Sequence, residues 1–96
     1  MAEIEKEKRR GAILRHLAET TGDQLSLDML KIGCGAMGIP SNIDQVENAV
    51  VWLSEQGLAE MNKLGHMKTA RLLPDGREVV EGLRTIRGIL DPMAKG

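Results

Sequence analysis

Apolar positions in the first third of the chain recur with the period of an α-helix. A first helix is expected over about residues 3–20, with a buried face made of Ile13, Leu14, Leu17 and Ala18. Thr21-Gly22-Asp23 ends this helix, and residues 24–25 fit a very short strand. A second helix is expected from Leu27 toward Met37, with Ser26 as its N-cap.

Two glycines stand inside the second predicted helix. Gly33 and Gly35 each cost about 1 kcal/mol relative to alanine at a helical position. Either another backbone approaches the helix closely at these residues, or the helix ends early.

The clearest helix boundaries follow Gly38. Gly38 and Pro40 stop the second helix, and either Ser41 or Asn42 caps a third one that extends to Gln56. The inward stripe of this third helix consists of Val46, Ala49, Val50 and Leu53. Gly57 is placed to end it in the left-handed conformation.

The hydrophobic period changes after the third helix. Residues 58–62 and 67–73 alternate like two short strands, joined by a loop over residues 63–66 in which Gly65 allows a hairpin turn. Pro74 suits the first position of a last helix that ends at Asp91-Pro92. The apolar face of that helix is expected to contain Val79, Val80, Leu83, Ile86 and Leu90. The pattern predicts an α+β fold in one domain over residues 1–96, with its core at about residues 10–88.

Composition narrows the possible functions. Thirteen basic and fourteen acidic side chains give a formal net charge of -1, so no global positive field attracts nucleic acid or an anionic membrane. Cys34 is the only cysteine, which excludes a disulfide within the chain and fits a reducing compartment. No apolar run approaches the length of about 18 residues that a membrane span needs. A soluble, cytoplasmic protein without a membrane partner is expected.

The order helix, helix, turn, helix, hairpin, helix resembles the winged-helix regulators of the MarR and ArsR type. The resemblance spans about residues 10–83 and rests on two segments, Trp52-Leu53-Ser54-Glu55-Gln56-Gly57-Leu58 and Ala70-Arg71-Leu72-Leu73-Pro74-Asp75-Gly76-Arg77. The opening at residues 9–17 is further similar to small ArsR-like proteins of Mu-like phages and prophages. The resemblance implies a winged helix-turn-helix with a three-helix core, a two-stranded hairpin wing and a C-terminal helix. Leu73 departs from it, because a threonine usually caps the last helix of these families.

The resemblance also implies a phage-type transcriptional regulator that binds double-stranded DNA. In such proteins the first half of the third helix enters the major groove, and the wing contacts phosphates. The matching residues here are Ser41, Asn42, Gln45 and Asn48 on the helix and Lys63, His66, Lys68 and Arg71 on the hairpin. Asp44 and Glu47 oppose this function, and no Lys or Arg lies between Lys31 and Lys63.

Catalytic and cofactor chemistry find little support in the sequence. Residues 33–38 match G-x-G-x-x-G, but Ile-Pro follows the last glycine and the chain is too short for a dinucleotide-binding sheet. His16 and His66 lack partners at metal-ligand spacing, and Cys34 has no base nearby in the sequence. We therefore expect no enzyme activity, cofactor, metal or small-molecule substrate.

Val51 and Trp52 suggest a protein interface instead. Both cannot point inward together with Val50 and Leu53 on one helix, so some apolar surface should be left over. This surface and the apolar face of the last helix predict a homodimer interface made of Val51, Trp52, Val79, Leu83, Ile86 and Leu90. The same surface also suits a winged-helix module that binds another protein and never contacts DNA.

Overall fold

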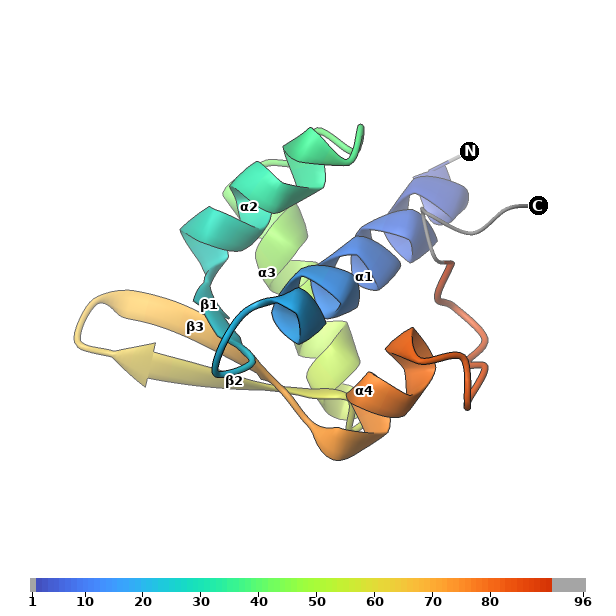
Figure 1. Ribbon diagram of the computed structural model, residues 1–96. Helices are drawn as coiled ribbons and strands as arrows, with labels where there is room; N and C mark the ends of the chain where they lie inside the picture. Colours follow the sequence, from blue (N-terminus) through green and yellow to red (C-terminus); the bar gives the residue numbers. More distant parts are fainter. Residues whose placement is uncertain (1, 91–96) are drawn as a thin grey trace.

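The computed structural model describes residues 2–90, with side chains from Glu3 onward, and confirms the α+β architecture. This part of the chain forms four helices and three strands (Figure 1). Their bounds are α1 Ala2–Glu19, β1 Gln24–Ser26, α2 Leu27–Ala36, α3 Ile43–Glu55, β2 Ala59–Leu64, β3 Met67–Leu72 and α4 Pro74–Val80.

The core lies where α1 crosses the other helices. Helix α1 contacts α2, α3 and α4, and it contributes Ile13, Leu14 and Leu17, all of them fully buried. The opposing side chains come mainly from the predicted inward faces of α2 and α3, namely Leu27, Leu30, Cys34, Val46, Ala49, Val50 and Leu53. The helical apolar pattern therefore predicted most of the core residues of these three helices, but not Ala12, which is also fully buried.

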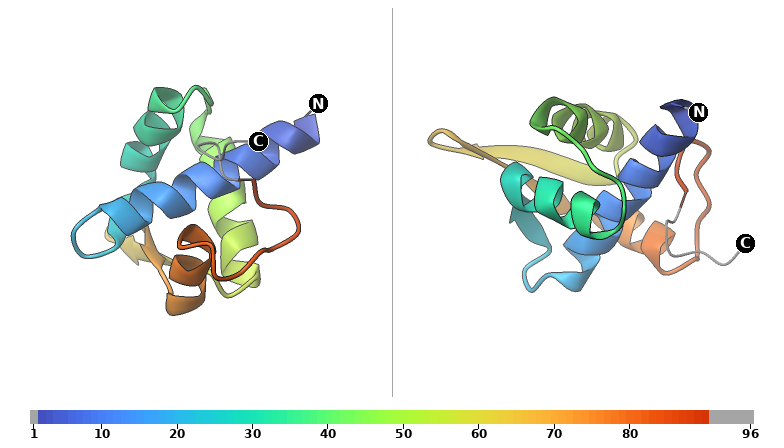
Figure 2. Two further views of the ribbon diagram at one scale, coloured as in Figure 1. Left: turned by 45° about the vertical axis from the view of Figure 1, so that its right-hand side comes forward. Right: turned by 90° about the horizontal axis from the view of Figure 1, so that it is seen from above.

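The sheet has three antiparallel strands in the order β1-β3-β2. The short strand at residues 24–26 pairs with β3, with Leu25 opposite Ala70, and adds a third strand to the expected hairpin. The hairpin register continues to Leu64 opposite Met67, so the predicted four-residue loop is reduced to a two-residue turn. Gly65 opens this turn with a φ of 62°, which glycine adopts at little cost. Figure 2 shows the hairpin extending beyond the helices.

Helix α3 begins and ends as its local sequence predicts. Asn42, rather than Ser41, is the N-cap: its side chain accepts from the backbone N–H of Gln45 at 2.8 Å. The side chain of Gln45 accepts in return from the N–H of Asn42 at 2.9 Å, which completes a capping box. At the other end the N–H of Leu58 donates to the carbonyl of Leu53 at 3.0 Å, and the chain leaves the helix through Gly57.

The last helix is much shorter than predicted. Helix α4 ends at Val80, and the N–H of Leu83 donates to the carbonyl of Glu78 at 2.9 Å in a turn that passes through Gly82. Residues 83–90, which we call the tail segment, are not helical and run back along α1 (Figure 2). The N–H of Leu90 donates to the carbonyl of Glu7 at 3.0 Å. Ile86 and Ile89 pack against the core, so the apolar spacing in this region reflects contacts with distant residues rather than a helical face.

At Gly33 the close neighbour of α2 is a side chain rather than the predicted backbone. A Cβ atom at Gly33 would lie 2.7 Å from the ring of His16 on α1. The Nε2 of His16 lies 2.9 Å from the carbonyl oxygen of Gly33 and donates to it. Nothing lies within 4 Å of the corresponding position at Gly35, and the helix ends one residue later.

Candidate functional site

Exposed side chains in the first half of helix α3, among them Asp44 and Asn48, form a surface that we call the α3 ridge. A hollow lies on each side of this ridge. One hollow, the hairpin groove, has a volume of about 450 Å³ and is lined by Leu27, Asp28, Ile43, Glu47, His66, Met67 and Lys68. The other, the α1–α3 hollow, has a volume of about 300 Å³ and is lined by Glu5, Lys6, Arg9, Arg10, Gln45, Asn48, Ala49, Val51, Trp52 and Glu55. Of the predicted residues, His66 and Lys68 line the hairpin groove, and Gln45 and Asn48 line the α1–α3 hollow.

Three of the four polar residues predicted on the third helix already have structural roles. Ser41 accepts a hydrogen bond from Nε of Arg9 at 2.6 Å and donates to the carbonyl of Ile39 at 2.9 Å. Asn42 and Gln45 use their side-chain oxygens in the capping box of α3. Their amide nitrogens are the groups left to donate to a ligand. Asn48 is exposed one turn further along the ridge.

Two of the four basic residues predicted on the hairpin are held by carboxylates. The Nζ of Lys68 lies 2.9 Å from Oε2 of Glu47 on α3, which joins the hairpin to that helix. The Nη2 of Arg71 lies 3.3 Å from Oε1 of Glu60, directly across the hairpin. Lys63 and His66 are exposed near the turn, and within residues 2–90 neither forms an ion pair. Of the four predicted basic residues, Lys63 and His66 at the hairpin tip are therefore the two left to contact a phosphate.

Glu60 and its neighbours form a small network on the sheet. The side chain of Asn62 donates to Oε1 of Glu60 at 3.1 Å, and Arg71 contacts the same oxygen. The hydrogen bond from Asn62, followed by the charge and hydrogen bond of Arg71, lowers the pKa of Glu60. The carboxylate consequently stays ionised and continues to hold Arg71 in mildly acidic solution.

The hairpin groove is partly apolar. Of its lining residues, Ile43 is 38% exposed and Met67 is 53% exposed. Asp28 and Glu47 add carboxylates to the same groove. This combination of apolar and acidic groups differs from a purely phosphate-binding surface.

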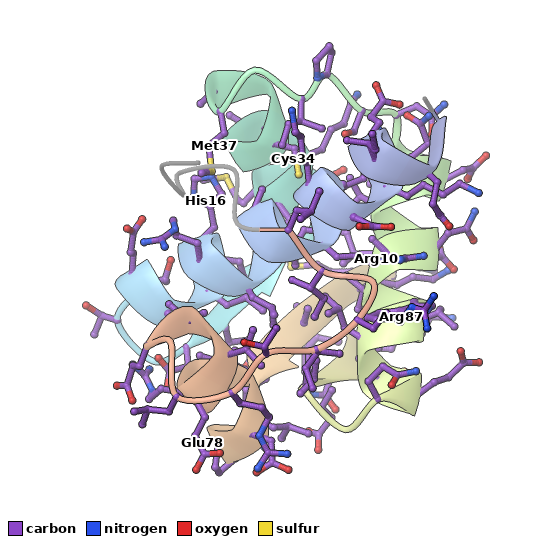
Figure 3. The ribbon with its side chains drawn as sticks, turned by 90° about the vertical axis from the view of Figure 1, so that its right-hand side faces the viewer. Arg10, His16, Cys34, Met37, Glu78 and Arg87 are labelled. Carbon is purple, nitrogen blue, oxygen red and sulfur yellow. The ribbon has the colours of Figure 1, made fainter. Side chains whose placement is uncertain are left out.

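The apolar interface predicted at the other end of α3 is largely covered by the chain itself. The guanidinium of Arg10 lies 4.1 Å from the ring centroid of Trp52 and donates to the carbonyl of Gly88 at 2.9 Å. Figure 3 places Arg10 between α1 and α3, close to the tail segment. Trp52, Val79 and Ile86 pack against the core. The large apolar residues of the predicted interface that are still exposed are Val51 at 39%, Leu83 at 74% and Leu90 at 41%.

The sequence analysis did not identify Arg9 as a buried residue. Arg9 is only 2% exposed and lies at the junction of α1 with the start of α3, beside Ser41 and Cys34. Burial raises the pKa of the Cys34 thiol, while the charge of Arg9 and a hydrogen bond with Ser41 act in the opposite direction. The helical spacing of Arg9 with the buried residues Ile13 and Leu17 was the available signal for its inward position.

Comparisons of the chain with protein-family models, with curated proteins and with solved structures found no match. Among residues 2–90, no group of three or more His, Cys, Asp or Glu side chains is arranged to hold a metal ion. No helix in that range has the length and apolar content required to cross a bilayer.

Proposed function

We propose that this protein is a winged-helix DNA-binding protein that acts as a transcriptional regulator of phage or prophage type. The observation that carries the proposal is the position of the exposed α3 ridge beside a hairpin whose tip bears Lys63 and His66. A helix in this position fits the major groove of B-DNA, and the hairpin then acts as a wing along the neighbouring backbone.

The available side chains divide into two roles. Lys63, together with Lys68 once it leaves Glu47, neutralises phosphates and supplies affinity that does not depend on sequence. Asn48 and the amide groups of Asn42 and Gln45 donate to base edges. With these two phosphate contacts, the logarithm of the binding constant should fall with the logarithm of salt concentration with a slope of about -2.

Fluorescence anisotropy with a labelled random duplex at low salt tests this function. We expect dissociation constants of about 1–100 µM at physiological salt, which are typical of nonspecific binding, and tighter binding at low salt. Lys63→Ala should weaken binding and reduce the salt slope by about 1. Arg87→Ala is the matched control, since it removes one positive charge from the tail segment, far from the hairpin (Figure 1). Absence of binding, or equal effects of the two variants, would refute the proposal.

A protein partner is the second candidate function, and the hairpin groove favours it. The groove places exposed Ile43 and Met67 beside Asp28 and Glu47, a lining that suits a basic amphipathic segment. In such a module, Glu47→Gln would not strengthen binding of random duplex. It would instead weaken binding of the basic partner, because the partner pairs with the Glu47 carboxylate.

A homodimer is also proposed, because Val51, Leu83 and Leu90 expose apolar surface. Light scattering across a range of protein concentrations tests it, and Leu83→Ser is expected to shift the equilibrium toward the monomer. A clean monomer at the highest concentration would contradict the dimer without affecting the DNA proposal.

A further inference from the structure

The α1–α3 hollow has the lining of a small anion site rather than that of a packing defect. Arg9, Arg10 and Lys6 bring positive charge from α1, and Gln45 and Asn48 bring amide groups from α3. Its apolar wall consists of Ala49, Val51 and Trp52. A volume of about 300 Å³ lies at the lower end of the range for small-molecule pockets.

Arg9 supplies an unused hydrogen-bond donor at this site. Its side chain is almost fully buried, and Nε is satisfied by Ser41 at 2.6 Å. The Nη2 atom is buried and has no hydrogen-bond partner among the residues that the structure describes. A buried guanidinium nitrogen without an acceptor is unfavourable, so an additional acceptor at this position would stabilise the arrangement.

Glu5 lies beside that donor without satisfying it. Its Oε2 is 3.3 Å from Nη2 of Arg9, which is close enough for an ion pair but not aligned for a hydrogen bond. The Glu5 side chain is 50% exposed and stands on the first turns of α1, so it can move into solvent. The Glu5 carboxylate therefore lies where the carboxylate of a ligand could pair with Arg9, and no hydrogen bond holds it there.

The remaining lining residues define which anions suit the hollow. Arg10 is held over the Trp52 ring at 4.1 Å, so that cation and apolar wall are adjacent. Glu55 also lines the hollow, and its negative charge would repel a second negative charge on a ligand. A singly charged carboxylate with a compact apolar body fits the adjacent cation and apolar wall and carries no second negative charge. A phosphate dianion has two negative charges and no apolar body.

We propose that the α1–α3 hollow binds a small organic monocarboxylate. The ligand carboxylate displaces Glu5 and accepts from Nη2 of Arg9, and its apolar body lies against Val51 and Trp52. The hollow shares Gln45 and Asn48 with the proposed DNA interface. Carboxylate binding is measured without DNA, so failure of one proposal can be distinguished from failure of the other.

Tryptophan fluorescence of the full chain tests the site directly. Trp52 is the only aromatic residue, so its emission reports the hollow without interference from tyrosine or another tryptophan. Cyclohexanecarboxylate, which does not absorb at the excitation wavelength, should produce a saturable change. Cyclohexanecarboxamide and inorganic phosphate at equal ionic strength should not. No saturable change with the carboxylate, or an equal response to either control compound, would overturn the proposal.

A pair of charge variants tests the displacement of Glu5. Glu5→Gln removes the internal competitor and is expected to tighten cyclohexanecarboxylate binding by about two- to fivefold, the range expected for a partly exposed ion pair. Glu3→Gln makes the same charge change at an exposed position of α1 outside the hollow and should leave the affinity unchanged. Both side chains are solvent-accessible, so neither variant is expected to impair folding. Equal affinities for the two variants, or weaker binding by Glu5→Gln, would contradict the proposed role of Arg9.

Discussion

Gly76→Ala should destabilise the protein, because α4 rests directly on the chain that leaves α3. A Cβ atom at Gly76 would lie 2.1 Å from the carbonyl oxygen of Leu58 and 2.8 Å from Cδ1 of Leu72. The Leu72 side chain can move, but the Leu58 oxygen belongs to the backbone and accepts from the N–H of Leu73 at 3.0 Å. Relieving the clash therefore requires α4 to shift and weakens that hydrogen bond.

The expected loss follows from three contributions. Overpacking costs about 1–3 kcal/mol, and the weakened hydrogen bond adds up to about 1 kcal/mol. The higher helix propensity of alanine offsets up to about 1 kcal/mol of this loss in the free energy of unfolding. The sum is a destabilisation of about 2 kcal/mol, which corresponds to a fall in Tm of about 8–16 °C for a domain of this size.

Gly35→Ala provides the matched control for this prediction. Gly35 is exposed near the end of α2, and nothing lies within 4 Å of the position that its Cβ would take. The same substitution should therefore leave the stability unchanged or raise it by up to about 1 kcal/mol. Both variants are measured by urea and thermal unfolding followed by circular dichroism. A Gly76→Ala variant as stable as the original protein would show that α4 does not pack on Leu58 in this way.

Three further predictions concern single side chains. Asn42→Ala removes the cap of α3 and should reduce the free energy of unfolding by about 1 kcal/mol in urea titrations; an unchanged midpoint would contradict the capping box. The Cys34 thiol, buried and with a raised pKa, should react with a thiol reagent only after unfolding, and rapid labelling of the folded protein would argue against its position. The pKa of Glu60 lies below its ordinary value of 4.5, so its contribution to stability is present above that value and is lost as the pH falls through the lowered pKa. Glu60→Gln should flatten this acidic decline in thermal unfolding, and an unaltered pH profile would exclude the contribution.

Elements with local boundary signals were predictable from the sequence. The limits of α3 depend on Pro40, Asn42 and Gly57, which act within one helical turn. The hairpin follows from the change of hydrophobic period and from Gly65. These features need no knowledge of distant contacts, and the structure agrees with them.

The parts that were not predicted depend on residues far apart in the chain. The spacing of Val79, Leu83 and Ile86 suggested a long last helix, but Gly82 ends α4 and Ile86 packs on the core from the tail segment. The ion pair of Lys68 with Glu47 joins two elements, and no local pattern indicates it. The inward position of Arg9 likewise depends on the approach of Ser41 from the start of α3.

The salt dependence of duplex binding by Glu47→Gln tests the central proposal most directly. This substitution removes a negative charge from the α3 ridge and releases Lys68 from its ion pair. Lys68 then reaches a phosphate without first breaking an ion pair, so binding should be tighter than in the original protein and the salt slope at least as steep. Glu81→Gln, an exposed substitution of equal charge at the end of α4, should change neither quantity. Unchanged or weaker binding by Glu47→Gln would contradict the placement of duplex DNA against α3 and the hairpin.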